Sequence, residues 1–340
     1  MNNSRWYEND GRYLEVVLSS KAVMTRNLKG YKFPERMSID EKDEVAQKVR
    51  DALADQGLTQ LSLDGIGNSE FDDLIDSQII SNEGLFDDPE GKVILTNDDR
   101  SLAVILNNGD HIRIKAQASG YTNSVYRECE KTAVEIEKKL DVAFSNKYGY
   151  LGSSLYSTGL GFKYMFTIAI PGIVRTGDGL DILSDKVKAH DWNIYPFLKG
   201  DKSIRGDVYI VASNPVMGSD EASVLAAGEK LINDIVKIEQ LCRDNLRKNR
   251  PDILENSFYR SYGILYYSKG LDPLEALDLI SWIRLYHGQE DKSEIDIDWP
   301  QINTITSQLL WQVFPKNIKG NYQADVRFTA ARIAKILKKK

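Results

Sequence analysis

The stretch Leu102-Ala-Val-Ile-Leu-Asn-Asn-Gly-Asp-His-Ile-Arg-Ile-Lys115 contains two apolar runs joined by a tight polar turn. Apolar, β-branched runs on either side of Asn-Gly are typical of a β-hairpin. The similar run Lys92-Val-Ile-Leu-Thr96 precedes it and is joined to it by a turn at residues 97–100. We therefore predict a meander of three antiparallel strands. This order of elements excludes the regular strand–helix alternation of a parallel, dinucleotide-binding sheet.

Apolar periodicity on both sides of the meander predicts further strands and a series of helices. The strongest helix is expected to have Ser219 as its N-cap, and the pattern after Pro251 is entirely helical. The further strands are expected at residues 14–18, 164–170 and 207–212. The helices are expected at residues 37–58, 124–143, 174–189, 220–247, 253–268, 272–286, 300–313 and 323–338. We predict an α+β fold, with an antiparallel sheet flanked by helices in residues 1–250 and a small all-α C-terminal domain in residues 251–340.

The composition is that of a globular protein with an acidic balance. The 340 residues include 44 Lys and Arg against 50 Asp and Glu, which gives a net charge of −6. This balance disfavours a nucleic-acid or membrane-surface binder, although it allows a local basic pocket for phosphates. Two cysteines and three histidines give little material for disulfides or a metal centre. No stretch is long and apolar enough to span a membrane, and we expect a cytoplasmic protein.

Four motifs follow one another along the chain. They are Val17-Leu-Ser-Ser-Lys-Ala-Val-Met-Thr-Arg-Asn-Leu28, Asn107-Asn-Gly-Asp-His-Ile-Arg-Ile114, Gly149-Tyr-Leu-Gly-Ser-Ser-Leu-Tyr-Ser-Thr-Gly-Leu-Gly161 and Ser213-Asn-Pro-Val-Met-Gly-Ser-Asp-Glu221. In this order and spacing they resemble the ATP:guanido phosphotransferase family, and within it the bacterial protein arginine kinases. The resemblance covers most of the chain. It implies the guanido kinase catalytic fold followed by a small helical domain.

The reaction of that family sets clear requirements for the site. The γ-phosphoryl group of ATP moves in line to a guanidinium nitrogen, so cations must surround the phosphates as charge spreads over their oxygens. Carboxylates must hold and deprotonate the guanidinium, whose pKa lies above about 12. Magnesium offsets part of the remaining charge. The resemblance therefore implies ATP and Mg as cofactors and the arginine side chains of a protein as substrate.

This chain departs from the family pattern at the residues that carry charge. In the phosphate loop Ser-Ser-Arg-x-Arg, the two arginines are replaced by Lys21 and Val23. Lysine supplies a point charge without the bidentate fork of arginine, and valine supplies no charge. In the motif Asn-Glu-Glu-Asp-His-Leu-Arg, the two glutamates become Asn108 and Gly109, while the final arginine is kept as Arg113. The group that should position and deprotonate the guanidinium is therefore missing.

The later motifs are altered in the same way. Ser154 stands where the family has a reactive cysteine, so the negative charge of a thiolate is missing. Lys163 replaces the arginine that follows this loop, and residues 195–201 contain no recognisable Arg-Gly-x-x-Gly-Glu loop. Among the family's phosphate-binding arginines, only Arg113 is intact; two positions hold lysine and two are lost.

The resemblance still assigns residues to each part of the site. It gives Asp110 an indirect role at magnesium, and it gives no catalytic residue, because Gly109 and Ser154 occupy the family's glutamate and cysteine positions. The alternative for Arg113 is a structural ion pair with Asp110, and for His111 a structural hydrogen bond. The nucleotide-binding residues are expected to be Ser20, Lys21, Arg113, Lys163 and Met165.

A partial motif lies near the C-terminus. Ala324-Asp-Val-Arg-Phe-Thr329 resembles the phosphoarginine-reading Arg-Asp-x-x-Arg-Ala motif of bacterial protein arginine kinases, without its leading arginine. The resemblance implies a phosphoarginine-type site that contains Asp325 and Arg327. The alternative is an ordinary amphipathic terminal helix.

These substitutions predict a pseudokinase with a binding or regulatory role, because each lost charge-assisted contact removes transition-state stabilisation. The alternative is a weakly active ATP:protein-arginine phosphotransferase that takes its carboxylate from the acidic stretch Glu70-Phe-Asp-Asp-Leu-Ile-Asp76. A third hypothesis is an interaction protein that binds no nucleotide and engages other chains through its C-terminal helices. The expected partner is a protein or a protein-arginine substrate, and a homodimer is left open.

Overall fold

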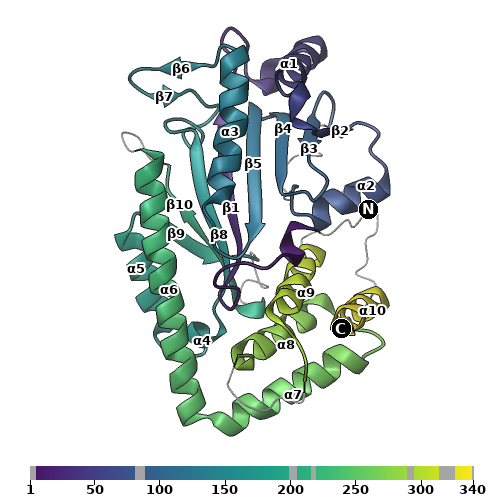
Figure 1. Ribbon diagram of the computed structural model, residues 1–340, viewed down its shortest axis with the longest axis vertical. Coiled ribbons are helices and arrows are strands. Elements are labelled where there is room, and N and C mark those ends of the chain that lie inside the picture. Colours follow the sequence, from purple (N-terminus) through teal and green to yellow (C-terminus); the bar gives the residue numbers. More distant parts are fainter. Residues whose placement is uncertain are drawn as a thin grey trace.

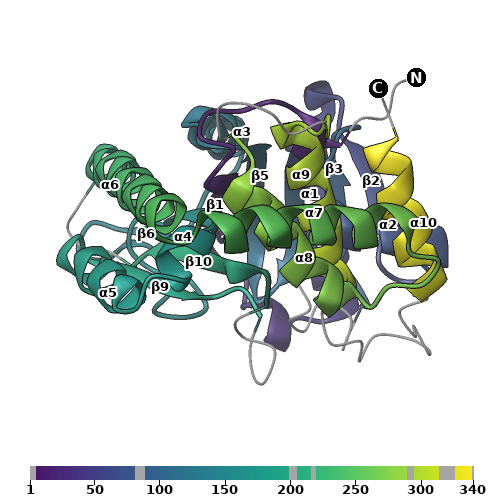
Figure 2. The ribbon, with the colours of Figure 1, turned by 90° about the horizontal axis from the view of Figure 1, so that it is seen from below.

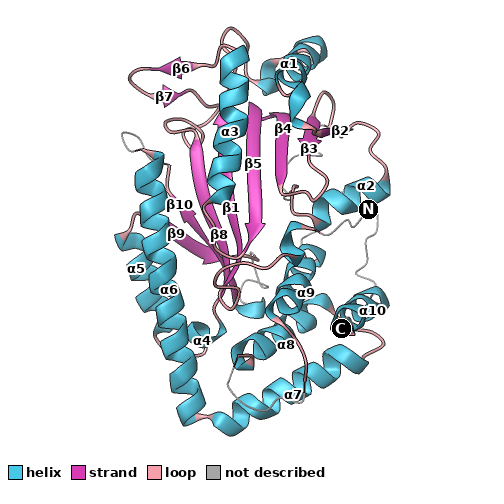
Figure 3. Ribbon diagram, viewed as in Figure 1, coloured by secondary structure: helices cyan, strands magenta, loops and turns pink. Residues whose placement is uncertain are grey.

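An eight-stranded antiparallel sheet forms the centre of the molecule (Figures 1 and 3). This computed structural model describes residues 5–80, 89–198, 205–215, 220–288, 295–313 and 326–338. The strand order is β2-β3-β4-β5-β1-β8-β10-β9, and every neighbouring pair is antiparallel. The strands are β1 Val17–Arg26, β2 Thr59–Ser62, β3 Val93–Thr96, β4 Leu102–Asn108, β5 Asp110–Ser119, β8 Phe162–Ala169, β9 Trp192–Pro196 and β10 Val208–Ser213. The predicted α+β fold with its antiparallel sheet is confirmed.

Helices flank the sheet, and a two-stranded ribbon of β6 Phe144–Ser145 and β7 Gly149–Tyr150 extends from one end (Figure 3). Within the described residues, no helix is long and apolar enough to cross a membrane. The helices are α1 Ile39–Ala52, α2 Asn68–Asp76, α3 Ser124–Lys139, α4 Pro171–Val174, α5 Gly179–Ala189, α6 Glu221–Asn249, α7 Pro251–Tyr267, α8 Pro273–Tyr286, α9 Trp299–Gln312 and α10 Val326–Leu337.

Helices α1, α3, α5 and α6 cover one face of the sheet, and α3 and α6 lie in front of the strands in Figure 1. Alternate residues of each strand point to this side because side chains in a strand have a period of two. Ala22 and Met24 of β1 and Phe166 and Ile168 of β8 enter this core, where Ile235 of α6 packs with them. We call this side the helical face.

The opposite face of the sheet is covered in two places. At its lower end, Leu18, Ala169 and Val208 share one core with helices α7 to α10, which lie together at the lower end of the molecule in Figures 1 and 2. Farther along, α2 and residues 77–80 pack over β3 and β4, where Ile79 joins a smaller core. The C-terminal helices are therefore built onto the sheet, and they share its core.

A buried polar network strengthens this union. The side chain of Arg284 on α8, only 1% exposed, donates to the backbone oxygen of Leu14 at 2.8 Å. Arg243 on α6 donates to Glu239 at 2.7 Å and to the backbone oxygen of Arg284 at 3.1 Å. Burial lowers the pKa of Arg284 to about 9. These buried hydrogen bonds hold α6, α8 and the segment before β1 in one geometry.

Three strands of the sheet, β1, β2 and β9, differ from what the sequence predicts. The expected strand at 14–18 is instead β1, which begins at Val17 and continues through the polar residues to Arg26. This segment is extended because it pairs along its length with β5 on one side and β8 on the other. Strands β2 and β9, which form the two edges of the sheet, are not predicted, and residues 59–92 are expected instead to be an irregular connection with a short helix.

The helix expected at 174–189 is in fact two helices, α4 and α5. They are separated around Gly177, a residue that weakens a helix by its backbone freedom. The N-cap of α6 is Asp220, whose side chain accepts the Ser223 amide at 2.7 Å. Ser219, the expected cap, lies outside the described residues.

Candidate functional site

Basic side chains gather on the face of the sheet opposite α3 and α6. Lys21 lies on β1, Arg113 and Lys115 on β5, and Lys163 on β8, and we call these four residues the basic cluster. Val23 lies directly opposite Lys115 on one side and Lys163 on the other. Directly opposed residues of antiparallel strands share a face, with Cβ atoms about 5 Å apart. The structure therefore brings together Lys21, Arg113 and Lys163, which the sequence analysis assigned from separate motifs. Val23 lies between them, at a position where the family has an arginine.

Lys21 is buried, with its ammonium group bound to the protein itself. Nζ donates to Oε1 of Gln78 at 2.7 Å, and it lies 5.8 Å from the ring centre of Trp6 and 5.7 Å from that of Trp311. Burial, and then the charge of Lys115, hold the pKa of Lys21 well below its ordinary value. Lys21, which the resemblance assigns to a phosphate contact, is thus bound instead to the segment that follows α2.

Lys115 belongs to the same cluster and was missed in the sequence. Its Nζ donates to the backbone oxygens of Gln78 and Ile79. Burial, and then the neighbouring charge of Arg113, lower its pKa to about 7. The period of two in a strand could have identified it, because a residue two positions after Arg113 on β5 must share its face.

Arg113 has a different environment from the two lysines. It is half-buried on β5, opposite Thr25 of β1 and Ile105 of β4. Its guanidinium forms no hydrogen bond or ion pair with any residue that the structure describes, so the alternative of an ion pair with Asp110 is not observed. Arg113 is therefore the member of the cluster that is best placed to meet an anion.

Asp110 holds three loops together at one end of the sheet. Its Oδ1 accepts from Nδ2 of Asn27 at 2.8 Å and from the amide of Ser153 at 2.7 Å. Asn27 in turn accepts from the amide of His111 at 2.8 Å. The carboxylate thus links the end of β1, the β4–β5 turn and the loop at 151–158. It is 2% exposed, and this geometry is that of a loop clamp.

The chain offers little to a magnesium ion on its own. Among the described residues, no group of three His, Cys, Asp or Glu side chains is arranged to hold a metal. Asp110 is the one carboxylate that the sequence associates with magnesium, and its Oδ1 is already saturated by donors. These residues do not fit a metal held by the protein, and no chemical step is derived through one.

Gly109 and the serine loop lie next to each other at the mouth of the site. A Cβ atom built on Gly109 would have the hydroxyl of Ser153 at 3.8 Å as its nearest described neighbour, with nothing else within 4 Å. Apart from the chain neighbours of Gly109, no described carboxylate therefore lies within 4 Å of this Cβ position. Ser154 is exposed, with its Oγ 3.3 Å from Oγ of Ser157. The φ of Gly109 is +75°, a conformation that a glutamate would adopt only with strain.

His111 and Arg26 have structural roles. The Leu28 amide donates to Nδ1 of His111 at 2.9 Å, and Nε2 lies 2.7 Å from the backbone oxygen of Lys32. With Nδ1 accepting, Nε2 carries the proton, and burial lowers the pKa of this histidine. Arg26 pairs with Glu137 at 2.5 Å and so anchors the end of β1 to α3. Neither side chain is available for catalysis.

Ser20 and Met165 are separated by the pleat of the sheet. Met165 lies opposite Lys21 and so belongs to the face of the basic cluster. Ser20 precedes Lys21 and points to the helical face, where its Oγ donates to the backbone oxygen of Gly120 at 2.8 Å. The structure therefore places Lys21, Arg113, Lys163 and Met165 together and Ser20 apart from them.

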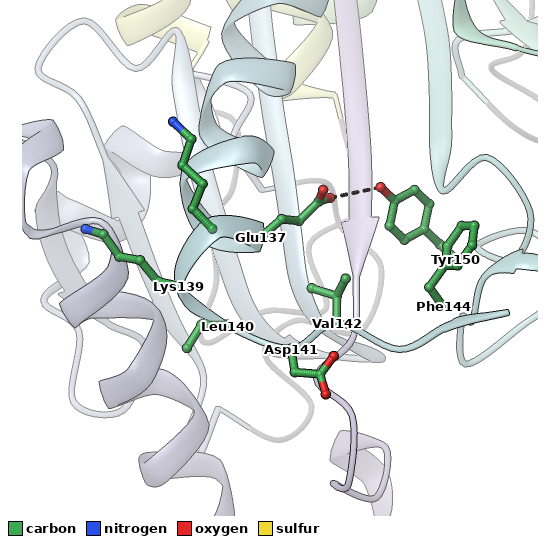
Figure 4. Close-up of a pocket in the computed structure, with 8 residues that line it drawn as sticks. Glu137, Lys139, Leu140, Asp141, Val142, Phe144 and Tyr150 are labelled. Atoms are coloured by element: carbon green, nitrogen blue, oxygen red, sulfur yellow. Dashed lines mark hydrogen bonds between the residues drawn. The ribbon is translucent and has the colours of Figure 1, made fainter.

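A hollow of about 620 Å³ lies away from these residues, at the C-terminal end of α3 (Figure 4). Glu137 and Tyr150 face each other across it, and the tyrosine hydroxyl donates to the carboxylate at 3.0 Å. Arg26 stacks on the ring of Tyr150, 3.5 Å from its centre. None of the residues expected at the active site lines this hollow, so it does not mark the candidate site.

Two of the sequence-derived sites lie partly outside the described residues. Arg327 is exposed in the first turn of α10, whereas Asp325 is outside the described part of the chain. Residues 195 and 196 end β9, and residues 199–201 of the expected loop are also outside it.

Comparison with known proteins places this geometry in context. The model of the family "ATP:guanido phosphotransferase, C-terminal catalytic domain" matches residues 42–242. A protein-arginine kinase of Pelotomaculum thermopropionicum is 28% identical over 293 residues, which cover 83% of this chain and 81% of the relative. A protein-arginine kinase of Clostridium novyi is 25% identical over 341 residues, or 98% of this chain and 97% of the relative.

Solved structures agree on the fold. A lombricine kinase is 17% identical with a TM-score of 0.59, covering 70% of this chain and 69% of that chain. A duplicated taurocyamine kinase from Schistosoma mansoni is 20% identical with a TM-score of 0.57, covering 67% of this chain and 33% of that chain. At this identity the likeness concerns the fold alone. Taken with the family match over more than half of its length, the four motifs and the antiparallel sheet establish that this chain belongs to the ATP:guanido phosphotransferase family.

Proposed function

We propose that this chain is a pseudokinase of the protein-arginine-kinase type, which binds an anionic ligand or a protein partner and does not transfer phosphate. The observation that carries the proposal is the position of Gly109. The position has no side chain of its own, and apart from its chain neighbours Asn108 and Asp110 no described carboxylate comes within 4 Å of a Cβ atom built there. A guanidinium with a pKa above about 12 is a poor nucleophile until a base removes its proton.

The nearest acidic residue does not replace the missing glutamate. Asp110 accepts hydrogen bonds from Asn27 and Ser153, which hold it as a loop clamp. Asp110 is 2% exposed, so an incoming guanidinium would have to open the surrounding loops to reach its carboxylate. Neutral Ser154 also adds no charge, because a serine hydroxyl is not ionised near neutral pH. These groups support loss of catalysis with retention of the scaffold.

The alternative of an active enzyme needs a carboxylate from α2, and the contacts of that helix argue against it. Asp73 is paired with Arg5 and Arg100, the second at 3.0 Å. Asp76 is paired with Arg332 of α10 at 2.8 Å. Of the four acidic residues on α2, Asp73 and Asp76 are therefore engaged in joining the helix to other elements, whereas Glu70 and Asp72 are exposed. Releasing either one would leave a partly buried arginine without its partner.

Residual ligand binding is favoured by the electrostatics of the basic cluster. Arg113 has no hydrogen-bond or ion-pair partner among the described residues, and Lys163 lies on β8 on the same face of the sheet. A polyphosphate is the ligand that a half-buried guanidinium and a lysine on one face would attract. The proposed nucleotide is bound weakly, because two of the family's arginines are lost and Lys21 is bound to Gln78.

A nucleotide titration tests the binding part of the proposal. Calorimetry with MgATP on the full chain should give a saturable, weak signal that Arg113→Gln reduces about tenfold or more, because a charge-assisted contact contributes roughly 1.5–3 kcal/mol. Arg127→Gln, an exposed position on α3, is the matched control and should bind as the wild type does. A chain that gives no signal with MgATP would instead support the interaction protein that binds no nucleotide.

A further inference from the structure

The side chain of Gln78 lies against the basic cluster, although it belongs to the segment that follows α2. Its Oε1 accepts from Nζ of Lys21 at 2.7 Å, and the residue is 3% exposed. Lys21 donates no other hydrogen bond to any residue that the structure describes. The ammonium group that the family resemblance assigns to a phosphate is therefore occupied by a neutral acceptor from the chain itself.

The backbone of Gln78 is fixed, whereas its side chain is held at one point. Lys115 donates to the backbone oxygen of Gln78, and the next residue, Ile79, is buried in the smaller core over β3 and β4. Within the described part of the chain, the amide nitrogen Nε2 forms no hydrogen bond. Rotation of this side chain therefore breaks one hydrogen bond and leaves the backbone in place.

The rest of the cluster leads toward this contact. Arg113 lies opposite Thr25 and Lys163 lies opposite Val23, and all of them except Thr25 are partly exposed. Lys21 is two residues before Val23 on the same face of β1, which places it about 7 Å farther along the strand. A chain of phosphates that starts at Arg113 and passes Lys163 thus meets Lys21 next, where the amide of Gln78 is bound.

An anion would compete with this amide for the same donor. A buried ammonium group without an acceptor is costly, so Gln78 stabilises the site when it is empty. A phosphate oxygen is the stronger acceptor, because a hydrogen bond between two charged groups is roughly twice as strong as one between neutral groups. The two acceptors exclude each other at Nζ of Lys21, and the bond to Gln78 must be given up before the anion gains its own.

We propose that the Gln78 side chain is an autoinhibitory contact of the anion site, which withholds Lys21 from a polyphosphate until the ligand displaces it. The proposal deepens the proposed function and rests on its anion-binding part, because it states what limits affinity at that site. None of the four sequence motifs contains Gln78. It is thus an affinity-determining residue contributed by a segment outside them.

Calorimetric titration of the full chain with tripolyphosphate tests this contact. Gln78→Gly removes the side chain and suits the φ of +62° at this position. It should bind tripolyphosphate about tenfold or more tightly than the wild type, because Lys21 is left to the anion. Gln78→Glu keeps the length of the side chain and places a carboxylate on Lys21, so it should bind about tenfold or more weakly. Circular dichroism establishes that each variant is folded, and either variant alone decides the outcome.

Two further variants show where the effect arises. Gln47→Ala, at an exposed position on α1, is the matched control and should bind tripolyphosphate as the wild type does. Gln78→Gly combined with Lys21→Met should lose the gain in affinity, because the gain depends on the freed ammonium group.

The outcomes separate this contact from the proposed function. Equal affinities of Gln78→Gly, Gln78→Glu and the wild type overturn the autoinhibitory contact and leave weak anion binding in place. A gain that persists in the double variant with Lys21→Met also overturns it. If no form of the chain binds tripolyphosphate, the contact and the anion-binding part of the proposed function both fail, while the absence of phosphoryl transfer is tested separately by the formation of phosphoarginine.

Discussion

Two lysine side chains point into the interior from the middle of the sheet. Lys21 and Lys115 lie on neighbouring strands, and both bind the same short segment through Gln78. Burial is the largest cause of the lowered pKa in each case. The protein therefore keeps near its centre two amines that lose their protons far more easily than a surface lysine does.

The titration of Lys115 predicts an unusual dependence of stability on pH. Its pKa is about 7 in the folded chain and about 10.4 in the unfolded chain. Between these values the unfolded state binds more protons, so the free energy of unfolding rises with pH from about 7 to about 9.5. Lys115→Met should make this rise shallower, as measured by urea unfolding at pH 7, 8 and 9.

The matched control for this experiment is Lys131→Met, an exposed position on α3, which should keep the wild-type slope. An unchanged slope in Lys115→Met would mean that the ammonium group of Lys115 in the wild type is not desolvated.

Buried tyrosines set the upper end of the pH range over which the free energy of unfolding rises, because burial raises the pKa of residues such as Tyr7 to about 12. Above about pH 10 their ionisation in the unfolded chain opposes the trend.

Asp110 gives a second prediction at this scale. Asp110→Ala removes the acceptor that Nδ2 of buried Asn27 shares with the partly buried amide of Ser153, so the free energy of unfolding should fall by about 2–4 kcal/mol. Ser154→Ala, on the exposed part of the same loop, should change it by about 0.5 kcal/mol or less. A stability of Asp110→Ala close to that of Ser154→Ala would contradict the loop clamp.

The sequence predicts that Lys21, Arg113 and Lys163 lie together, but it does not predict their environment, and their role at a nucleotide site stays a prediction. The motifs assigned Lys21, Arg113 and Lys163 to one site, and the strand register places them on one face. Nothing in the motif indicated that Gln78, 57 positions away, accepts the bond of Lys21. Contacts of this kind depend on how α2 packs, and local sequence patterns do not encode them.

At the scale of elements, residues 77–80 act as a cover on the basic cluster. Ser77 accepts from Trp6 at 2.8 Å and from Gln117 at 2.7 Å, while Gln78 accepts from both buried lysines. The φ of Gln78 is +62°, an unfavourable conformation that these contacts must offset. The cover is thus held by four described side chains from three elements, and it accounts for the burial of Lys21.

A double-mutant cycle measures how strongly this cover is held. Gln78→Leu leaves Lys21 buried without its acceptor and should lower the free energy of unfolding by about 1–3 kcal/mol. Lys21→Met combined with Gln78→Leu removes both partners and should recover most of that loss. Urea unfolding of the two single variants, the double variant and the wild type gives the coupling, and simple additivity would contradict the contact.

The helices and strands were predicted correctly where apolar periodicity is strong. They were missed where pairing with neighbouring strands decides whether a segment is extended. The first two strands of the meander and the helices after Pro251 were predicted nearly to their ends, whereas β5 continues beyond the predicted Lys115 to Ser119. Strand β1 was expected to end before Ser19, because polar residues in sequence suggest a loop. Its two neighbours, β5 and β8, make it a central strand, and that information lies at distant positions in the chain.

For the whole molecule, the important feature is the core shared by the sheet and the C-terminal helices. Leu18 and Val208 belong to the sheet, yet they pack with Phe258, Leu277 and Ile305. The division at residue 250 remains a prediction from the helical pattern. The shared core and the Arg243–Arg284 network indicate that the two parts fold together.

Removal of residues 251–340 tests that conclusion. The truncated chain exposes the apolar surface around Leu18, Ala169 and Val208, so it should aggregate or lose its cooperative unfolding transition. Circular dichroism during urea unfolding, with gel filtration, measures both properties. A soluble fragment that unfolds cooperatively would contradict the shared core and establish two independent domains.

The central claim is that the family scaffold persists here without phosphoryl transfer. Its most direct test is to incubate the purified full chain with MgATP and an arginine-rich protein, and to measure phosphoarginine by ³¹P NMR and mass spectrometry under conditions that preserve the phosphorus–nitrogen bond. The missing carboxylate at Gly109 predicts no phosphoarginine above the level without the chain. Phosphoarginine that accumulates only with ATP, and that disappears in Arg113→Gln, would contradict it.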